Sequence, residues 1–202
     1  MNKKIVHDAL ILTAFTLVLG FVLGLVYDVT KGPIKEAEEK AKQEAFSQVF
    51  EDASKFEALE FDKDAANKLA ADNGFSDTFD DIQTAFDANG EVAGYVITVT
   101  AKDGSQGSIT FSVGIRNDGT VNGYSITKIS ETPGLGMKAT EESFYSQFQN
   151  KLVEAFTVVK SAPAADNEIE AITGSTITSK AIANGCNAAI LYFNTELKGG
   201  AN

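Results

Sequence analysis

The chain has 202 residues, which is enough for one sizeable hydrophobic core and an appendage. Its formal net charge of −11 at pH 7 argues against a nucleic-acid partner, because phosphate backbones select basic surfaces. The chain has one cysteine, Cys186, and one histidine, His7. A single residue of each type excludes an internal disulfide, a cysteine-ligated iron–sulfur site, a histidine metal cluster and a Ser/His/Asp triad. We therefore expect neither a metal centre nor a catalytic side chain.

Residues 9–27 carry no charged side chain and predict a transmembrane helix. As a helix this run measures about 28 Å, which matches the hydrocarbon core of a bilayer. A cleaved signal peptide is the alternative, but its apolar core is usually shorter and no Ala-x-Ala-like site follows Tyr27. Lysines flank both ends of the run, so charge alone leaves its orientation equivocal. We predict an uncleaved anchor over residues 1–30, which should not conduct an ion by itself because its span lacks ionisable groups.

Residues 31–80 are predicted to form a juxtamembrane helix followed by an acidic excursion. The Thr-Lys-Gly-Pro run at 30–33 breaks the apolar pattern, and residues 34–50 then repeat small apolar side chains at helical spacing. The next segment, residues 51–81, is acidic and weakly periodic, with one short helical pattern at 65–71. This part of the sequence indicates no particular function.

From residue 81 the apolar residues follow a period of two, which predicts β-strands. The Asn-Asp-Gly run at residues 117–119 is a strong signal for a hairpin turn. We expect an antiparallel meander with one buried face. The predicted strands are residues 82–86, 95–101, 109–115 and 121–130.

The C-terminal part of the chain is predicted to contain two helices. Residues 140–152 carry an apolar stripe, residues 156–160 form a short strand, and residues 178–197 form the last helix. Cys186 lies on the apolar face of that helix and is expected to be a core residue. Because helices and strands are grouped, the class is α+β: a single N-terminal transmembrane helix, then an antiparallel-sheet domain over residues 81–202 with flanking helices.

Hydroxyl side chains and a glycine crowd residues 173–179, directly before the last predicted helix. A helix N-terminus carries unpaired N–H groups and partial positive charge, so it favours a phosphate, although a Ser/Thr-rich turn with an ordinary N-cap is the simpler alternative. The stretch resembles the flavinylation motif, in which a threonine carries FMN through a phosphoester bond. The resemblance implies that Thr176 is the attachment point. Glu170 stands where the family more often has aspartate, and Ser175 where it usually has alanine.

A second loop, residues 131–136, combines a proline with two glycines, which allow close backbone approach to a ligand. A buried loop leucine is the simpler interpretation of Leu135. The run resembles the second motif of the same FMN-binding domain, in which this loop lies against the flavin ring and ribityl chain. The resemblance implies ring-lining roles for Glu131, Thr132, Gly134, Leu135 and Gly136, and phosphate-side roles for Thr173, Gly174, Ser175 and Thr178.

The overall layout resembles the G subunits of Rnf-type ferredoxin:NAD⁺ oxidoreductase complexes, which pump Na⁺ or H⁺, and more distantly the C subunits of Na⁺-pumping NADH:quinone oxidoreductases. The resemblance implies an electron relay with covalent FMN, which works beside other membrane subunits. It also implies an extracytoplasmic soluble domain and maturation by a separate Mg²⁺-dependent flavin transferase. NAD itself should not bind, because no Gly-x-Gly-x-x-Gly unit is present. The alternative is a membrane-anchored flavin-binding sensor or docking module outside any pump.

Overall fold

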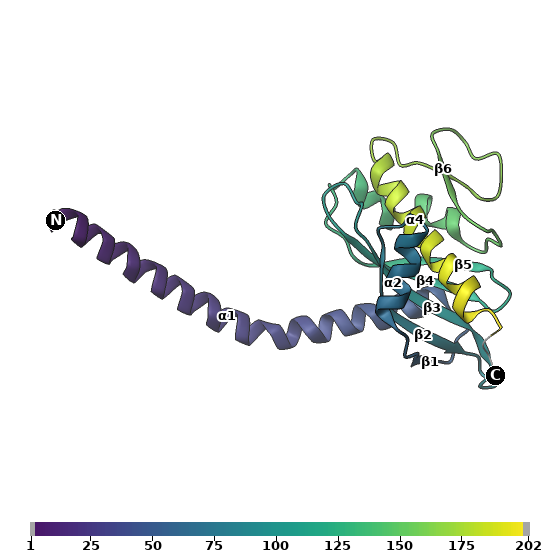
Figure 1. The fold of residues 1–202 in the computed structure, drawn as a ribbon, viewed down its shortest axis with the longest axis horizontal. Helices are drawn as coiled ribbons and strands as arrows, with labels where there is room; N and C mark the ends of the chain where they lie inside the picture. The colour runs from purple at the N-terminus through teal and green to yellow at the C-terminus, as the bar shows by residue number, and fades with distance from the viewer. Residues whose placement is uncertain (1–2, 200–202) are drawn as a thin grey trace. The chain divides into compact units, whose positions relative to one another are not determined.

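The computed structural model describes residues 3–199, so residues 1–2 of the predicted anchor and 200–202 of the predicted domain lie outside the described part. The chain forms two compact units, Met1–Ala41 and Lys42–Asn202. Helix α1 (Lys3–Val49) begins in the first unit and ends in the second (Figure 1).

The first unit consists of the apolar part of α1. An 18-residue window of this helix has a mean hydropathy of 2.6 and no buried residue, so its length and composition suit a membrane crossing. Thr13 and Thr16 donate their hydroxyl protons to helix carbonyls, 2.8 Å from Ala9 O and 3.1 Å from Leu12 O. These bonds remove the cost of placing two hydroxyl groups in an apolar environment.

The predicted helix break at residues 30–33 is wrong, because α1 runs through Pro33. A proline inside a helix removes one N–H donor and crowds the carbonyl four residues earlier. Here the residues that follow, from 35 to 45, are almost all Glu, Lys, Ala and Gln, which have high helix propensity. The helix therefore resumes directly after the proline.

The second unit contains a five-stranded antiparallel sheet whose strands pair in chain order. This confirms the predicted meander and adds one strand that the periodicity did not indicate. The strands are β1 (Lys55–Ala58), β2 (Thr78–Phe86), β3 (Val92–Ala101), β4 (Ile109–Arg116) and β5 (Val121–Lys128). The hairpin turn between β4 and β5 lies where Asn-Asp-Gly predicted it, with Gly119 at φ +95°.

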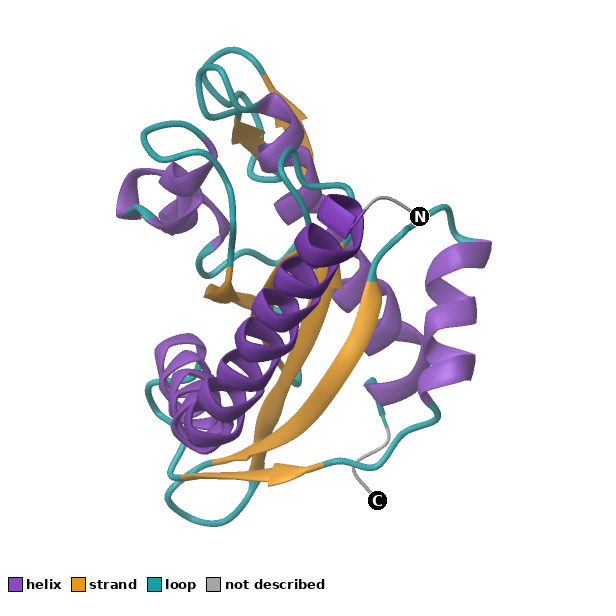
Figure 2. Ribbon diagram, turned by 90° about the vertical axis from the view of Figure 1, so that its left-hand side faces the viewer, coloured by secondary structure: helices purple, strands orange, loops and turns teal. Residues whose placement is uncertain are grey.

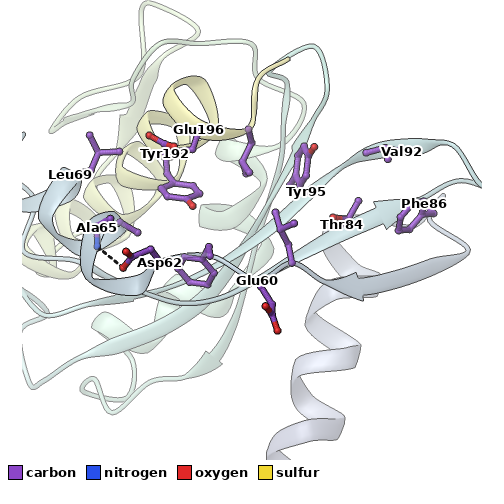
Figure 3. Close-up of a pocket in the computed structure, with 14 residues that line it drawn as sticks. Glu60, Asp62, Ala65, Leu69, Thr84, Phe86, Val92, Tyr95, Tyr192 and Glu196 are labelled. Atoms are coloured by element: carbon purple, nitrogen blue, oxygen red, sulfur yellow. Dashed lines mark hydrogen bonds between the residues drawn. The ribbon is translucent and has the colours of Figure 1, made fainter. Parts of the chain in front are cut away.

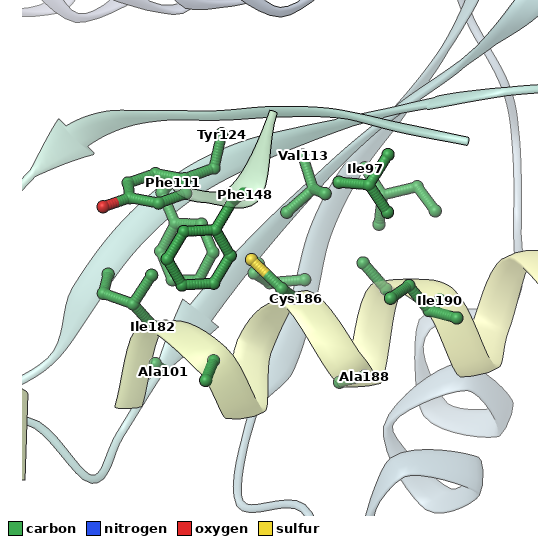
Figure 4. Packing of buried hydrophobic residues seen from close by; sticks show 14 of the residues in the cluster. Ile97, Ala101, Phe111, Val113, Tyr124, Phe148, Ile182, Cys186, Ala188 and Ile190 are labelled. Atoms are coloured by element: carbon green, nitrogen blue, oxygen red, sulfur yellow. The ribbon is translucent and has the colours of Figure 1, made fainter. Parts of the chain in front are cut away.

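One face of the sheet is covered by α4 (Thr176–Tyr192), which buries most of its residues. Figure 4 shows the Cys186 side chain directed from α4 toward the sheet, among Phe111, Tyr124 and Phe148. Burial raises the pKa of the Cys186 thiol well above its usual value, which keeps the group protonated and unreactive. The prediction of a core cysteine is confirmed.

The expectation that only one face of the sheet is buried is wrong, because the last turns of α1 lie on the opposite face (Figure 2). A Cβ added at Gly114 would lie 2.6 Å from the carbonyl oxygen of Val49, and one at Gly94 would lie 2.7 Å from the ring of Phe50. Glycines in β3 and β4 thus make room for the helix end. The buried cluster on this face consists of Phe46, Val49, Phe50, Ala85 and Val96.

The second unit begins at Lys42, whereas the sequence placed the start of its domain at residue 81, which falls inside β2. Helix α2 (Lys63–Asp72) confirms the short helix predicted at 65–71 and belongs to the same unit as the sheet. Asp62 caps it, with its carboxylate accepting from Asp64 N and Ala65 N at 3.0 Å each. The segment that looked like an excursion is therefore part of the fold.

The predicted helix over residues 140–152 is wrong. The structure has three short pieces there: η1 (Gly136–Thr140), α3 (Glu142–Tyr145) and η2 (Ser146–Phe148). Asn150 adopts a positive φ of 55°, and Lys151 then exchanges backbone hydrogen bonds with Val121 at 2.8 and 3.0 Å. This extended pairing ends the helical path, and it leaves Leu152 69% exposed instead of on an apolar stripe.

Two further strands, β6 (Thr157–Val159) and β7 (Glu168–Glu170), form a small parallel sheet. β6 confirms the strand expected near residues 156–160. The chain then turns into α4, which starts two positions earlier than predicted and continues into a π-helical turn, η3 (Phe193–Leu197). The pieces after β5 therefore connect the sheet to the start of α4, where the hydroxyl-rich run lies.

Candidate functional site

The two motif loops, residues 131–136 and 173–178, lie against each other in the second unit. A Cβ added at Gly136 would lie 2.8 Å from the hydroxyl oxygen of Thr178, and one at Gly174 would lie 3.2 Å from Cδ2 of Leu135. Real Cβ atoms almost never approach another atom within 3.0 Å, so Gly136 is required for this contact. The structure thus brings together two motifs that are far apart in the chain.

The first loop turns tightly and presents an apolar side chain. Gly134 has φ +74°, and the backbone N–H groups of Leu135 and Met137 both donate to Thr132 O, at 3.1 and 3.2 Å. Leu135 is 43% exposed, so the interpretation as a buried loop leucine is wrong. An exposed apolar side chain at the tip of a tight loop suits contact with a flat apolar ligand.

Glu131 supports this loop from the inside. Its side chain is 5% exposed, and Oε1 accepts from Ser105 N at 2.7 Å and Gln106 N at 3.2 Å. A Cβ added at Gly136 would lie 2.6 Å from the other carboxylate oxygen of Glu131, Oε2. The burial and hydrogen bonds of Glu131 indicate that it positions the loop through the turn after β3. Direct contact with a ligand remains a prediction for this residue.

The second loop leads into α4 without a side-chain cap. Ser175 is the N-cap residue, yet its hydroxyl makes no capping hydrogen bond. The hydroxyl of Ser179 fixes the turn instead, because it accepts from Ile172 N at 3.0 Å and donates to Ser175 O at 2.9 Å. The simple interpretation of the run as a Ser/Thr side-chain N-cap is therefore wrong. The N–H groups of the first turn of α4 remain available for an anion.

The hydroxyl groups at the start of α4 differ in exposure. Thr176 is half-buried, whereas Ser175 is 7% exposed. Thr178 is fully buried, and its hydroxyl oxygen has no hydrogen-bond partner among residues 3–199. A buried hydroxyl without a partner costs about 1–3 kcal/mol, so a bound polar group that reaches it would remove that cost. Thr176, the predicted attachment residue, is therefore more accessible than its neighbour Ser175, whose hydroxyl could compete with it.

The remaining predicted residues lie on the outside of the site. Thr132, Thr173 and Gly174 are exposed at the tips of the two loops. Glu170 ends β7, where its backbone N–H donates to Gln147 Oε1 at 2.7 Å, and its side chain is exposed. All of the predicted cofactor residues therefore belong to the two adjacent loops and the first turn of α4.

A sizeable pocket of the second unit lies elsewhere. It has a volume of about 720 Å³ and is formed by α2, the strands β2 and β3, and the C-terminal end of α4 (Figure 3). Phe61, Tyr95 and Tyr192 supply aromatic walls, and Glu196 is one of three acidic residues that line it. Burial, followed by the nearby Glu196 and Asp62 charges, raises the pKa of Tyr192. Sequence reasoning missed this pocket because its walls come from segments without a motif.

We assign the candidate site to the two loops because their polar groups suit an anionic ligand. Cavity size often indicates a ligand site, but a site also needs a few convergent polar groups. The loops supply a free helix N-terminus, an unpartnered hydroxyl and a half-buried threonine, whereas the large pocket combines apolar walls with acidic groups. An anionic ligand is favoured at the loops and disfavoured at the pocket.

Comparison with known proteins gives two family matches. Residues 104–191 match the FMN-binding domain, and residues 1–49 match the RnfG N-terminal region. The first match contains both motif loops. The second contains the whole apolar part of α1.

Several relatives match along almost the whole chain. The chain is 38% identical over 199 residues to the G subunit of the Na(+)-translocating ferredoxin:NAD(+) oxidoreductase complex of Acetobacterium woodii, covering 97% of this chain and 95% of the relative. It is 32% identical over 184 residues to the G subunit of the proton-translocating ferredoxin:NAD(+) oxidoreductase complex of Clostridium ljungdahlii, covering 91% and 89%.

Two solved structures show weaker likeness. The C subunit of the Na(+)-translocating NADH-quinone reductase from Parabacteroides distasonis has 22% identity and a TM-score of 0.49, over 69% of this chain and 76% of that chain. NqrC of Shewanella oneidensis has 19% identity and a TM-score of 0.48, over 57% and 58%.

Proposed function

Because the chain belongs to the family of G subunits of ion-translocating ferredoxin:NAD⁺ oxidoreductase complexes, we propose that it is a membrane-anchored electron-transfer subunit that holds FMN at its two motif loops. The observation that carries the proposal is the contact between these loops, inside the segment that matches the FMN-binding domain. The protein is not catalytic alone, and it works with the other membrane subunits of its complex.

The residues present fit a flavin mononucleotide. The exposed Leu135 and the tight turn around Gly134 offer an apolar surface and backbone N–H groups to the ring, and the start of α4 offers free N–H groups to the phosphate. The unpartnered hydroxyl of Thr178 lies between the two loops. When bound, the flavin supplies one- and two-electron redox chemistry, while the protein sets its position and exposure.

We place the covalent link on Thr176. Its hydroxyl oxygen forms a bond to the phosphorus on the riboflavin side of FAD, the pyrophosphate bond breaks, AMP leaves, and the hydroxyl proton is released. A separate Mg²⁺-dependent flavin transferase performs this step. The half-buried position of Thr176 at the first residue of α4 supports this choice over the buried Ser175.

We further propose that the second unit lies on the extracytoplasmic side of the membrane. A covalent bond prevents loss of the cofactor in a compartment from which a free flavin would diffuse away. The apolar part of α1 contains no Asp, Glu, Lys, Arg or His between residues 9 and 27, so the ion path belongs to other subunits.

The attachment is tested by denaturing gels. The chain is produced together with the flavin transferase, denatured in SDS and examined for flavin fluorescence that travels with it. Fluorescence is expected for the wild type and for the matched control Ser175→Ala, and is expected to vanish in Thr176→Ala. Thr176→Ala should still fold, because Thr176 is a half-buried residue at the start of α4 and not one of the fully buried residues of the core, and its unfolding midpoint checks this. Undiminished fluorescence in Thr176→Ala would contradict the assignment.

Co-purification tests the place of the protein in a complex. Affinity isolation of the full chain from its native membrane should bring down several polytopic membrane proteins, and ferredoxin-derived electrons should reduce its flavin. Isolation alone, or with a signalling partner, would instead support the flavin-binding sensor considered from the sequence.

A further inference from the structure

Two carboxylates outside the motif loops, the buried Asp77 and the half-buried Asp103, have buried oxygens without a partner among the described residues. Asp77 precedes β2 and is 3% exposed, and Asp103 follows β3 in the turn that leads to Ser105. Among the described residues, both oxygens of Asp77 and Oδ1 of Asp103 have no hydrogen-bond partner. Buried carboxylates are normally paired or hydrogen-bonded, so three unpartnered oxygens call for an explanation.

The two carboxylates lie against the same turn of α4. The side-chain amide of Asn184 donates to Oδ2 of Asp103 at 2.9 Å. A Cβ added at the next residue, Gly185, would lie 3.2 Å from Oδ1 of Asp77. The carboxylates of a loop before β2 and of the turn after β3 therefore lie against neighbouring residues of α4.

The electrostatics of this place are unfavourable in the absence of a cation. Burial, followed by the charge of Asp103, raises the pKa of Asp77 to about 7. Lys102 acts in the opposite direction, but it makes a smaller contribution and is exposed. Two mutually repelling carboxylates with free lone pairs are an arrangement that a bound cation stabilises.

We propose that Asp77 and Asp103 bind a hard divalent cation, and that Ca²⁺ is the cation they suit best. Ca²⁺ takes oxygen ligands in flexible geometry, whereas softer metals prefer the imidazole and thiolate groups. No group of three or more His, Cys, Asp or Glu side chains gathers within residues 3–199, so water must complete the coordination. The affinity is therefore expected in the weak range of about 10⁻⁴–10⁻³ M.

The cation would fasten the turn after β3 to the segment before β2. That turn also donates two backbone hydrogen bonds to Glu131, which supports the first motif loop. A bound cation thus stabilises the inner side of the candidate cofactor site without touching the cofactor. The sequence predicted no metal because its single histidine and single cysteine offer no ligand cluster, and only the fold brings Asp77 and Asp103 together.

The proposal is tested by titrating the full chain in detergent, after treatment with a chelator, with CaCl₂ and in parallel with MgCl₂. Calorimetry should detect Ca²⁺ binding, and the unfolding midpoint should rise by about 5–10 °C when Ca²⁺ exceeds its dissociation constant about 100-fold. Asp77→Asn and Asp103→Asn should each lose the heat and the shift. The matched control Asp64→Asn, an exposed aspartate in the first turn of α2, should keep both.

Each outcome supports or overturns the proposed cation site, and none of the measurements depends on bound flavin. An absence of both heat and midpoint shift in the wild type overturns the proposal, and so does a full Ca²⁺ response in Asp77→Asn. Binding of Mg²⁺ without binding of Ca²⁺ overturns the choice of cation. Because Asp77→Asn relieves repulsion in the cation-free state, it should fold, and its unfolding midpoint shows whether it has done so.

Discussion

The two ends of α4 lie in very different surroundings. At the N-terminal end, short polar side chains meet a glycine loop on an accessible surface, and at the C-terminal end aromatic residues line a pocket of about 720 Å³. The first end combines a helix N-terminus with hydroxyl side chains, which suits an anion, while the second combines apolar walls with acidic groups, which does not. The proposed cofactor site therefore rests on residue type at a helix terminus and not on the volume of a cavity. The comparison predicts that the two ends respond differently to substitution.

The largest effect on stability is expected at the C-terminal end. Phe193 is 1% exposed and its ring lies 6.2 Å from that of Tyr95, so Phe193→Ala should lower the free energy of unfolding by about 3–5 kcal/mol. Flavin fluorescence on denaturing gels should persist in the folded fraction. Leu152→Ala, which removes a 69% exposed apolar side chain, serves as the control with little change. Loss of flavin from folded Phe193→Ala would contradict the separation of the two ends.

The stability of the protein should depend on pH through Asp77, which lies against the middle of α4. Burial raises the folded-state pKa of Asp77 to about 7, so the folded state favours its neutral form; the contribution of Asp77 to stability is then fully present below about pH 4 and is lost as pH rises through 7. The groups that face Asp77 are Asp103 and Lys102 in the turn after β3 and Cys186 in α4. In cation-free buffer, Asp77→Asn should remove a loss of about 2–4 kcal/mol between those pH values.

Urea unfolding of the two proteins at several pH values provides the measurement. The comparison with Asp77→Asn matters, because other carboxylates also titrate in this range. Parallel curves for the wild type and Asp77→Asn would show that Asp77 titrates normally in the folded chain.

The smallest effect on stability is expected at the N-terminal end of α4, where the substitution should act mainly on flavin incorporation. Gly136→Ala would place a Cβ within 2.6–2.8 Å of atoms of Glu131 and Thr178, which forces the two motif loops apart. We expect a loss of about 1–3 kcal/mol and a clear drop in flavin incorporation, measured as flavin absorbance per folded chain. Gly32→Ala, where nothing lies within 4 Å of the added Cβ, is the matched control. Normal flavin content in Gly136→Ala would contradict a cofactor site that needs this contact.

Local sequence patterns predicted most of the features that depend on neighbouring residues in the chain. The alternation in β3 and β4, the turn at Gly119 and the apolar face of α4 around Cys186 all follow from side-chain spacing. The two motif loops were also recognised, because their residue types suit a phosphate and a flat ring wherever the fold places them.

Features that depend on distant partners were not predicted. The apolar stripe through residue 152 indicated a helix, but Lys151 pairs with Val121 of β5 and Asn150 turns out of the helical path. The strand pattern gave no reason for a glycine at position 114, and only the position of Val49 shows why glycine is needed there. The proximity of Asp77 and Asp103 likewise follows from tertiary structure, which a single-sequence pattern does not contain.

The last turns of α1 cover one face of the sheet, so they determine where a soluble fragment of this chain can begin. A soluble fragment that starts at residue 81 would lack β1, α2 and the beginning of β2, and would leave Val96 and the glycines of β3 and β4 uncovered. A fragment that starts at Lys42 keeps Phe46, Val49 and Phe50 in place while leaving out the apolar helix. Exchange of the membrane anchor between relatives should follow the same boundary.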